Sequence, residues 1–310
     1  MTPVRVGVVG VGHMGREHAR IYSKLPSAAF AGVFDADKAT SRKIAQQHHC
    51  RSFESLVEML DAVDAVSIAT PTSAHYETAK LFLGAGKSVL VEKPISNTSA
   101  EASELVELAD KYRLVLQVGH IERFNPVLQA LEERLTRPRF IESHRLSPFP
   151  GRSTDIGVVM DLMIHDLEII LHLVRSPVAS LDAVGVPVLS TSEDIANVRI
   201  RFENGCVANI TTSRISPEKL RKIRVFQDDA YISLDYMKQE GLIYRKEGGQ
   251  ITRNDIPVFK DEPLKRQLDS FLHCVAQKGQ PVVSGNHAAA ALNLASRICA
   301  QIAEFQSKNP

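Results

Sequence analysis

The sequence predicts an α/β protein with two domains: residues 1–120 form a doubly wound parallel sheet, and residues 121–310 an α/β domain with an open, mostly antiparallel sheet. Strand and helix patterns alternate up to residue 120, which is typical of a parallel sheet covered on both faces. A glycine-rich turn follows the first strand, and short strand patterns dominate after residue 180. The 310 residues also exceed the size at which single cores usually stop growing.

Composition excludes several functional classes. The chain has 37 Lys and Arg against 36 Asp and Glu, so net charge favours neither nucleic acid nor an anionic membrane as partner. No apolar run approaches the roughly 18 residues of a spanning helix, and the N-terminus lacks a signal-peptide layout. Four scattered cysteines without a CxxC pair predict no zinc site and no disulfide framework. We therefore expect a cytoplasmic protein without a bound metal.

The first predicted strand, Val4–Val9, leads into a Gly-x-Gly-x-x-Gly turn and then a helix over Arg16–Leu25. The first glycine permits a tight turn, the second lets the backbone approach a pyrophosphate, and the third lets helix and strand pack closely. The helix N-terminus adds positive potential for phosphate groups. The residues predicted to bind the cofactor here are Gly10, Val11, Gly12, His13, Met14 and Gly15.

A second strand, Phe30–Phe34, ends at Asp35, which stands 20 residues after the third glycine. This is the spacing expected for the acid that binds the ribose hydroxyls in a Rossmann dinucleotide-binding domain. Its carboxylate would repel a 2′-phosphate, and Asp37 adds to that repulsion, so NAD is favoured over NADP. Lys38 and Arg42 lie near enough to keep NADP as the alternative.

The strand and helix alternation continues, and the predicted elements are helices Phe53–Leu60, Ala74–Gly84 and Ala100–Tyr112 and strands Ala65–Ala69, Ser88–Val91 and Leu114–Val118. The carboxyl ends of such strands face the ligand crevice. Thr70-Pro71 and Glu92-Lys93-Pro94 follow two of these ends. A surface ion pair is the alternative for Glu92 and Lys93.

One motif resembles a catalytic pair but does not fit that role. Tyr76-x-x-x-Lys80 matches the acid/base pair of short-chain dehydrogenases, but it lies too early in the chain for that role. We interpret it as one face of an amphipathic helix.

After residue 120 the pattern changes to a helix opened by Glu122–Pro126, then a strand, a long helix and a series of strands. The remaining predicted elements are strands Arg139–Leu146, Asp182–Leu189, Ala196–Phe202, Cys206–Ser213, Arg221–Gln227, Ala230–Leu234 and Leu242–Arg245, and helices Val158–Val174, Leu264–Lys278 and His287–Gln306. Asn204-Gly205 is a strong hairpin signal between two of the strands.

Asp161 and His165 are four residues apart on one predicted helix, so their side chains can meet. A carboxylate on one imidazole nitrogen fixes the tautomer and raises the basicity of the other nitrogen, as a general base requires. A structural pair is the alternative. His165, Asp166 and His172 lack the spacing of a metal-ligand set. The remaining histidines are predicted to be surface residues.

Taken together, the glycine turn with Asp35, Thr70-Pro71, His75, Glu92-Lys93-Pro94 and Asp161-x-x-x-His165 resemble the glucose-fructose oxidoreductase, inositol dehydrogenase and MocA-type family. The resemblance implies a Rossmann domain, a second domain with an open sheet, and a homodimer or homotetramer formed through that sheet. It also implies a cis peptide before Pro94. The cofactor contacts that it implies are those of Thr70, Pro71, His75, Glu92 and Lys93.

The chemistry implied by the resemblance is hydride transfer from a sugar or polyol carbon to NAD. Lys93 would contact the reacting hydroxyl and stabilise the developing alkoxide. His165 would be the acid/base, and Asp161 would orient substrate and His165. With this resemblance, a catalytic pair is favoured over a structural one for Asp161 and His165.

Two narrower stretches, GHIERFNP at 119–126 and VVMDLMIHDLEII at 158–170, resemble the branch of the family that oxidises the 3-hydroxyl of UDP-N-acetylglucosamine. Its 3-keto product serves a partner aminotransferase, on the way to the diamino sugars of a glycolipid such as lipid A. Substrate contacts are expected from Lys93, Arg123, Asn125, Arg145, Arg152, Asp161 and His165.

Arg145 and Arg152 flank a loop rich in glycine and proline and are candidates to clamp a pyrophosphate, because a guanidinium binds phosphate oxygens in bidentate fashion. Solvated loop arginines are the alternative. Two other functions stay open. A dehydrogenase of a free sugar or inositol would not need these arginines, and a non-catalytic NAD-sensing regulator would not need Asp161 and His165.

Overall fold

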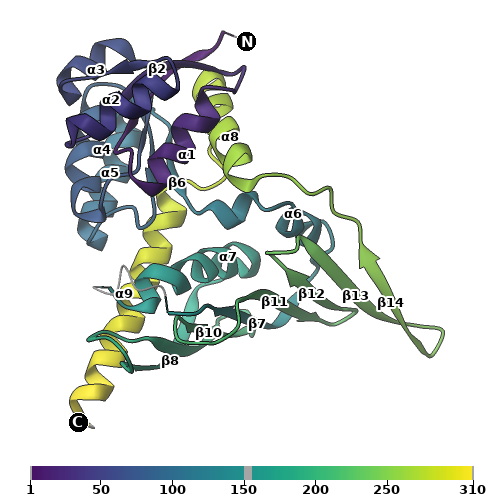
Figure 1. Cartoon of the computed structure of the whole chain (residues 1–310). Helices are drawn as coiled ribbons and strands as arrows, with labels where there is room; N and C mark the ends of the chain where they lie inside the picture. Colours follow the sequence, from purple (N-terminus) through teal and green to yellow (C-terminus); the bar gives the residue numbers. More distant parts are fainter. Residues whose placement is uncertain (1, 150–155, 309–310) are drawn as a thin grey trace. The chain divides into compact units, whose positions relative to one another are not determined.

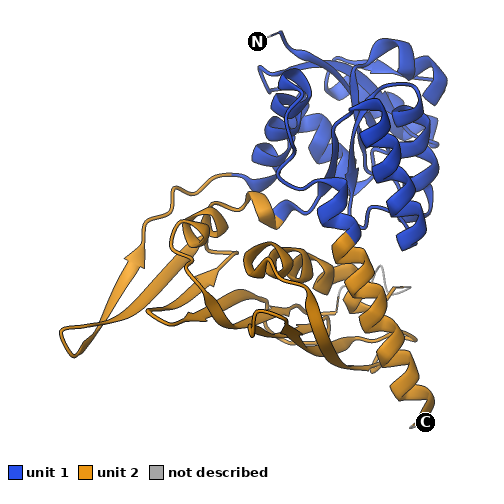
Figure 2. Ribbon diagram, turned by 180° about the vertical axis from the view of Figure 1, so that it is seen from behind, with its two compact units in different colours: residues 1–121, 262–289 blue, residues 122–261, 290–310 orange. Residues whose placement is uncertain are grey.

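The computed structural model describes residues 2–149 and 156–308 and divides into two compact units (Figures 1 and 2). The first unit comprises residues 1–121 and 262–289, and the second comprises residues 122–261 and 290–310. Residues 262–289 therefore pack with the first unit, although the sequence groups them with the second domain. Helix α8 (Pro263–Gln277) explains this, because its buried Leu268 and Phe271 belong to the same apolar core as Val6 and Val8 of the first strand. The functional division at residue 120 stays a prediction.

The first unit is built on a six-stranded sheet in the order β3-β2-β1-β4-β5-β6, with every pair parallel. The strands are β1 Val4–Val9, β2 Ala28–Phe34, β3 Arg51–Ser52, β4 Ala65–Ile68, β5 Ser88–Glu92 and β6 Leu116–Gly119. The strand order reverses between β1 and β4, which is where doubly wound folds bind their ligands. The predicted doubly wound sheet is confirmed.

The helices of the first unit are α1 His13–Tyr22, α2 Lys38–Gln47, α3 Leu56–Ala62, η1 Thr72–Ala74, α4 His75–Gly84, α5 Ser99–Tyr112 and α8. Their starts follow local capping chemistry. Thr98 and Glu101 form a reciprocal capping box at α5, and Asp37 accepts the Ala39 N–H at the start of α2. The sequence pattern predicts no element over α2, which has few apolar residues to mark its buried face, and none over the two-residue strand β3.

The second unit contains an eight-stranded sheet in the order β14-β13-β12-β11-β7-β10-β9-β8. The strands are β7 Pro138–Leu146, β8 Val178–Val186, β9 Ile195–Phe202, β10 Val207–Ser213, β11 Leu220–Gln227, β12 Tyr231–Asp235, β13 Glu240–Glu247 and β14 Gln250–Ile256. All pairs are antiparallel except β7 with β10, so the predicted mostly antiparallel sheet is confirmed. Strand β14 is not predicted by the sequence analysis.

Helices of the second unit lie against one face of this sheet (Figure 1). The shorter ones are η2 Ile121–Phe124 and α6 Pro126–Glu132, and the π-helical turn η3 Val159–Met163 continues into α7 Ile164–Val174. Helix α9 (Gly285–Lys308) begins in the first unit and ends in the second. Along β7, Ile141, Ser143 and Arg145 are buried, and Ser143 and Arg145 both contact Asp166 of α7. Alternate residues of each strand therefore face either the helices or the opposite face.

Candidate functional site

The glycine turn after β1 has the geometry of a dinucleotide site. Gly10 has φ of +82°, and a Cβ there would lie 2.8 Å from the Thr70 backbone nitrogen. A Cβ on Gly15 would lie 1.8 Å from the Gly10 carbonyl oxygen, so these two glycines are needed for packing. At Gly12 no atom of the described residues lies within 4 Å of the same position. The turn therefore leaves space at the glycine where a pyrophosphate approaches the backbone, and these residues fit such a cofactor.

Asp35 is fixed against this turn. Its Oδ2 accepts the Val11 N–H at 2.7 Å, and its Oδ1 accepts the Asp37 N–H at 2.9 Å. The carboxylate keeps further lone pairs, because an ionised carboxyl has about four acceptor positions. His13 and Met14 begin α1, where the first backbone N–H groups of a helix point toward an anion.

The two cations that favour NADP in the sequence are engaged elsewhere. Lys38 donates to the backbone carbonyls of Phe53 and Glu54, and Arg42 lies 3.3 Å from the Glu54 carboxylate.

His75 joins the loops that follow β4 and β5. Its Nε2 lies 2.9 Å from the Thr70 carbonyl oxygen and its Nδ1 lies 2.8 Å from the Pro94 carbonyl oxygen. The side chain is buried, and burial lowers its pKa, while the two carbonyl contacts act in the opposite direction. Both nitrogens thus meet backbone oxygens, and a direct contact of His75 with the cofactor stays a prediction. The Lys93–Pro94 peptide is cis, as the resemblance implies.

Glu92, at the end of β5, is held between two neighbours. His18 Nε2 of α1 lies 3.2 Å from its Oε1, and a Cβ on Gly119 would come within 2.6 Å of the carboxylate. Gly119 thus leaves the space that Glu92 occupies. His18 and His120 are buried, so the prediction that the remaining histidines lie at the surface is wrong for both. The buried face of α1, which also carries Ala19 and Tyr22, is the sequence signal for His18.

Asp161 and His165 lie where a π-helical turn passes into a regular helix. Asp161 is in η3 and His165 in the first turn of α7, and both side chains are partly exposed. Single π-turns inside helices are frequent at functional sites. The turn is anchored at its start by Glu193, whose Oε1 accepts the Val159 N–H at 3.2 Å. The predicted helix is confirmed, but its first turn is wider than an α-helix.

The three described residues with an expected role only in substrate binding are buried and bound to the protein itself. Arg123 pairs with Glu168 at 2.8 Å, and Asn125 caps α6 by accepting the Val127 N–H. Arg145 Nε donates to Asp166 at 2.6 Å and its Nη1 donates to Glu122 at 3.2 Å.

The pyrophosphate clamp expected of Arg145 stays a prediction, and two observations argue against it: the side chain is only 4% exposed, and its guanidinium is already paired with two carboxylates. Asn125 and Arg123 likewise support the fold in this geometry. Arg152 lies outside the described residues.

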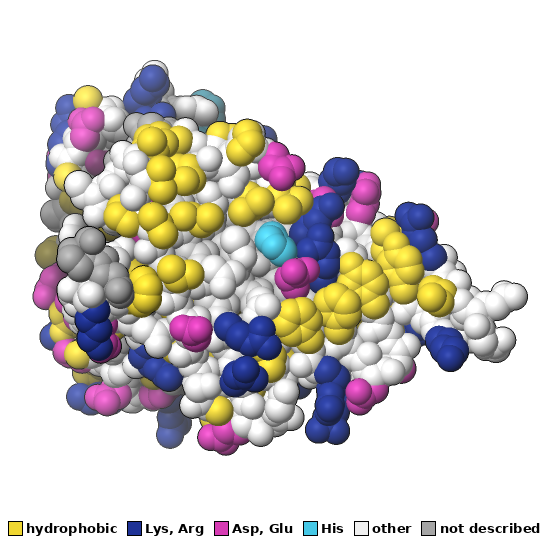
Figure 3. All heavy atoms as spheres, turned by 90° about the horizontal axis from the view of Figure 1, so that it is seen from below, with side chains coloured by type: hydrophobic (Ala, Val, Ile, Leu, Met, Phe, Trp, Pro, Cys, Tyr) yellow, Lys and Arg dark blue, Asp and Glu magenta, His cyan; other side chains and the backbone are white. Residues whose placement is uncertain are grey.

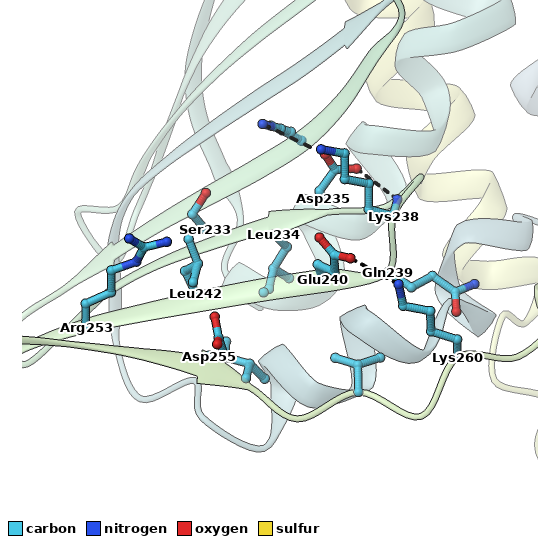
Figure 4. A pocket seen from close by; sticks show the side chains of 14 residues that line it. Ser233, Leu234, Asp235, Lys238, Gln239, Glu240, Leu242, Arg253, Asp255 and Lys260 are labelled. Atoms are coloured by element: carbon cyan, nitrogen blue, oxygen red, sulfur yellow. Dashed lines mark hydrogen bonds and ion pairs between the residues drawn. The ribbon is translucent and has the colours of Figure 1, made fainter.

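A pocket of about 550 Å³ lies on β12–β14 of the second unit (Figure 4). Asp235, Glu240, Arg253 and Lys260 are among the charged residues that line it, and Glu240 is paired with Lys260. None of the predicted site residues lines this pocket, so it has no part in the chemistry predicted above.

Within residues 2–149 and 156–308, no cluster of His, Cys, Asp and Glu is arranged to hold a metal ion. In the same part of the chain, no helix has both the length and the apolar character needed to cross a membrane.

The strand order, the glycine turn and Asp35 define a dinucleotide-binding protein with a second unit of its own. Residues 4–120 match the model of an oxidoreductase family with an NAD-binding Rossmann fold, and residues 130–233 match the GFO/IDH/MocA C-terminal domain. The chain belongs to the GFO/IDH/MocA oxidoreductase family, and the family resemblance seen in the sequence is confirmed.

Individual members of the family differ in how similar they are to this chain. The chain is 39% identical to UDP-N-acetylglucosamine 3-dehydrogenase of Acidithiobacillus ferrooxidans over 285 residues, which are 89% of this chain and 90% of the relative. A solved structure of that enzyme matches with a TM-score of 0.94 and 36% identity, covering 98% of this chain and 99% of the other. Inositol 2-dehydrogenase of Rhizobium meliloti is 25% identical, with 97% of both chains covered.

Proposed function

We propose that this protein is an NAD-dependent dehydrogenase that oxidises the 3-hydroxyl of UDP-N-acetylglucosamine to a 3-keto sugar. The observation that carries the proposal is the likeness to the Acidithiobacillus ferrooxidans enzyme, which extends over nearly the whole of both chains. Such a product suits a partner aminotransferase that makes diamino sugars for a glycolipid such as lipid A.

The residues proposed to hold the cofactor are those of the glycine turn, Asp35, Glu92 at the end of β5, and the loops after β4 and β5, which include Thr70, Pro71 and Lys93. The fixed carboxylate of Asp35 supports NAD over NADP, because it would repel a 2′-phosphate. The engagement of Lys38 and Arg42 with the segment around Glu54 supports the same choice. When bound, NAD supplies the hydride acceptor.

The catalytic roles are assigned to three side chains. Lys93 follows β5 and polarises the substrate hydroxyl, so that its proton is lost more easily. His165 accepts that proton as general base, and Asp161, which precedes it by four residues, orients it. The partial exposure of Asp161 and His165 supports these roles, since a group that meets substrate must be reachable.

We further propose a homodimer or homotetramer that buries the open face of the second unit's sheet. Four aromatic side chains form a row across β7, β11, β12 and β13, each opposite the next in register. Their ring centroids are 5.5 Å apart for Phe140 and Phe226, 4.7 Å for Phe226 and Tyr231, and 5.3 Å for Tyr231 and Tyr244. Figure 3 shows a band of hydrophobic side chains on this face. Contiguous exposed apolar surface is typical of an interface. Light scattering that gives the mass of a single chain would contradict this assembly.

The test of the reaction is to mix the purified protein and NAD with UDP-N-acetylglucosamine, other UDP-sugars, free hexoses and inositols, and to follow NADH by absorbance. NADH formation with UDP-N-acetylglucosamine, and a product with a carbonyl at C3, supports the proposal. NADH formation with inositol alone would replace it with the second candidate, which the Rhizobium meliloti relative favours. Binding of NAD without turnover of any substrate would favour the regulator.

A further inference from the structure

Two arginines face each other across neighbouring strands of the second unit. Arg221 of β11 is paired in register with Arg145 of β7, and both contact the same atom, Oε1 of Glu122, at 3.2 Å. Like charges directly opposite in a sheet are unfavourable unless other groups offset them. The carboxylates around this pair therefore decide how well each guanidinium is neutralised.

The two guanidinium groups differ in both partners and exposure. Arg145 has Asp166 as a further partner, and its side chain is 4% exposed. Among the described residues, the guanidinium of Arg221 is paired only with the Glu122 oxygen that it shares with Arg145, and its side chain is 38% exposed. Burial, and after it the neighbouring Arg145, lower the pKa of Arg221, while Glu122 and Asp166 act in the opposite direction.

Among the described residues, Asp166 also acts on Arg221 through its charge, but its hydrogen bonds go to Ser143 and Arg145. The third arginine of the cluster, Arg123, takes Glu168 as its partner, and burial raises the pKa of Glu168 to about 7. Tyr236, whose backbone N–H donates to the Arg221 carbonyl at 3.0 Å, is kept neutral because burial and the nearby carboxylates raise its pKa. Of the three arginines of this cluster, Arg221 is thus the one whose guanidinium is accessible, with Arg123 and Arg145 each only 4% exposed.

The cluster around Arg221 includes a residue of the helix that carries the proposed acid/base residue. Asp166, which holds Arg145, is the residue that follows His165 on α7, and its charge acts on Arg221. An anion bound at Arg221 is therefore placed on the side of the sheet that carries the catalytic helix.

We propose that Arg221 binds an anionic group of the substrate, a phosphate oxygen of the diphosphate in a nucleotide sugar. This assignment rests on the proposed function, and it takes the place of the clamp expected of Arg145. An exposed guanidinium whose N–H donors are available to a ligand matches phosphate oxygens in geometry and charge.

The test is calorimetric titration of the NAD-loaded protein with UDP and with uridine, comparing wild type with Arg221→Met, Arg221→Lys and Arg224→Met. We expect Arg221→Met to weaken UDP binding roughly 10- to 100-fold, the loss typical of one charge-assisted contact, and Arg221→Lys to restore part of it. Uridine, which has no phosphate, should bind wild type and variants alike. The KM for UDP-N-acetylglucosamine should rise by a similar factor with little change in kcat.

Arg224→Met is the matched control, because Arg224 lies three residues along the same strand on the opposite face, paired with Glu142 at 2.7 Å. It should leave UDP affinity unchanged, with the solution mass of each variant checked by light scattering. Arg221→Met leaves Glu122 paired with Arg145, so we expect it to fold, and Arg221→Lys gives a second measurement if it does not.

The outcomes separate the two proposals. Equal UDP affinity in wild type and Arg221→Met, or no UDP binding by wild type, would overturn the role of Arg221. Loss of UDP affinity in the variant, from a wild type that oxidises only unphosphorylated sugars, would keep the anion site and overturn the proposed substrate.

Discussion

Asp35 accepts the backbone N–H of Val11 at 2.7 Å, so the acid at the end of β2 is fixed directly on the glycine turn that follows β1. The contact joins two segments that are 24 residues apart in the chain. It holds the carboxylate in place before the cofactor binds, so binding costs less side-chain conformational entropy. The same residue thus supports the turn and is the one proposed to select the cofactor.

Replacing Asp35 with Ala should change the cofactor preference. The variant loses the acceptor for the ribose hydroxyls and the repulsion of a 2′-phosphate, so kcat/KM for NAD should fall roughly 10- to 100-fold while that for NADP falls less or rises. Initial rates with each cofactor measure the ratio. Asp37→Ser, which keeps a cap for α2, is the control and should shift the ratio much less. An unchanged preference in Asp35→Ala would contradict the assignment.

His75 should affect cofactor binding although it is buried. Its ring joins the carbonyls of Thr70 and Pro94, and loss of one hydrogen bond of this kind costs about 1 kcal/mol. We expect His75→Ala to raise KM for NAD up to about tenfold, with a smaller effect on kcat. His75→Gln, which can still donate to a carbonyl, should recover part of the loss. If alanine and glutamine gave the same KM as wild type, the two loops would not depend on this contact.

Loss of the proposed general base should slow turnover with little effect on NAD affinity. His165→Asn is expected to reduce kcat by roughly 10²–10⁴. His172→Asn is the matched control, because His172 is on the same helix and contacts Glu132 at 3.1 Å, away from the proposed chemistry. Steady-state rates and NAD titration of both variants give the answer, and a His165 variant near the wild-type rate would refute the role.

Glu168 should make stability depend on pH. Burial raises its pKa from 4.5 to about 7, so between these values the folded protein holds a proton that the unfolded chain has lost. Stability then falls as pH rises through this window, by on the order of 3 kcal/mol when complete. Glu168→Gln removes this titration.

Urea unfolding at several pH values measures this effect. Relative to Glu168→Gln, the wild type should become less stable from about pH 5 to pH 8. Glu133→Gln, at a residue whose side chain is 63% exposed, is the control and should parallel wild type. Parallel curves for wild type and Glu168→Gln would show that Glu168 is ionised throughout.

Much of the fold is predicted from short stretches because their signals are local. The β-branched runs of β1 and β5, the glycine turn and Pro126 at the first position of α6 each specify structure within a few residues. Two of the elements without such a local sequence signal show why. Helix α2 has a weak apolar pattern, and β14 is an edge strand with mostly exposed side chains, so neither shows the periodicity that burial imposes.

The residues of the candidate site likewise fall into those that the sequence predicts and those that only the fold reveals. Asp35 and the glycine turn are predicted from spacing, since the doubly wound sheet brings the ends of β1 and β2 together. The exposure of an arginine has no such local signal. Arg145 and Arg221 are register partners on β7 and β11, and only the folded chain shows that one is buried against Asp166 of α7 and the other is accessible.

By itself the sequence determined most of the order of strands and helices, the cofactor turn with its acid, and the helix that carries Asp161 and His165, because these depend on residues close together in the chain. The tertiary structure alone decided that α8 packs on the first unit, that His18 and Glu92 are neighbours, and that Arg145 has two carboxylate partners while Arg221 shares one of them. Burial and charge pairing depend on residues far apart in sequence, and only the folded chain brings those residues together.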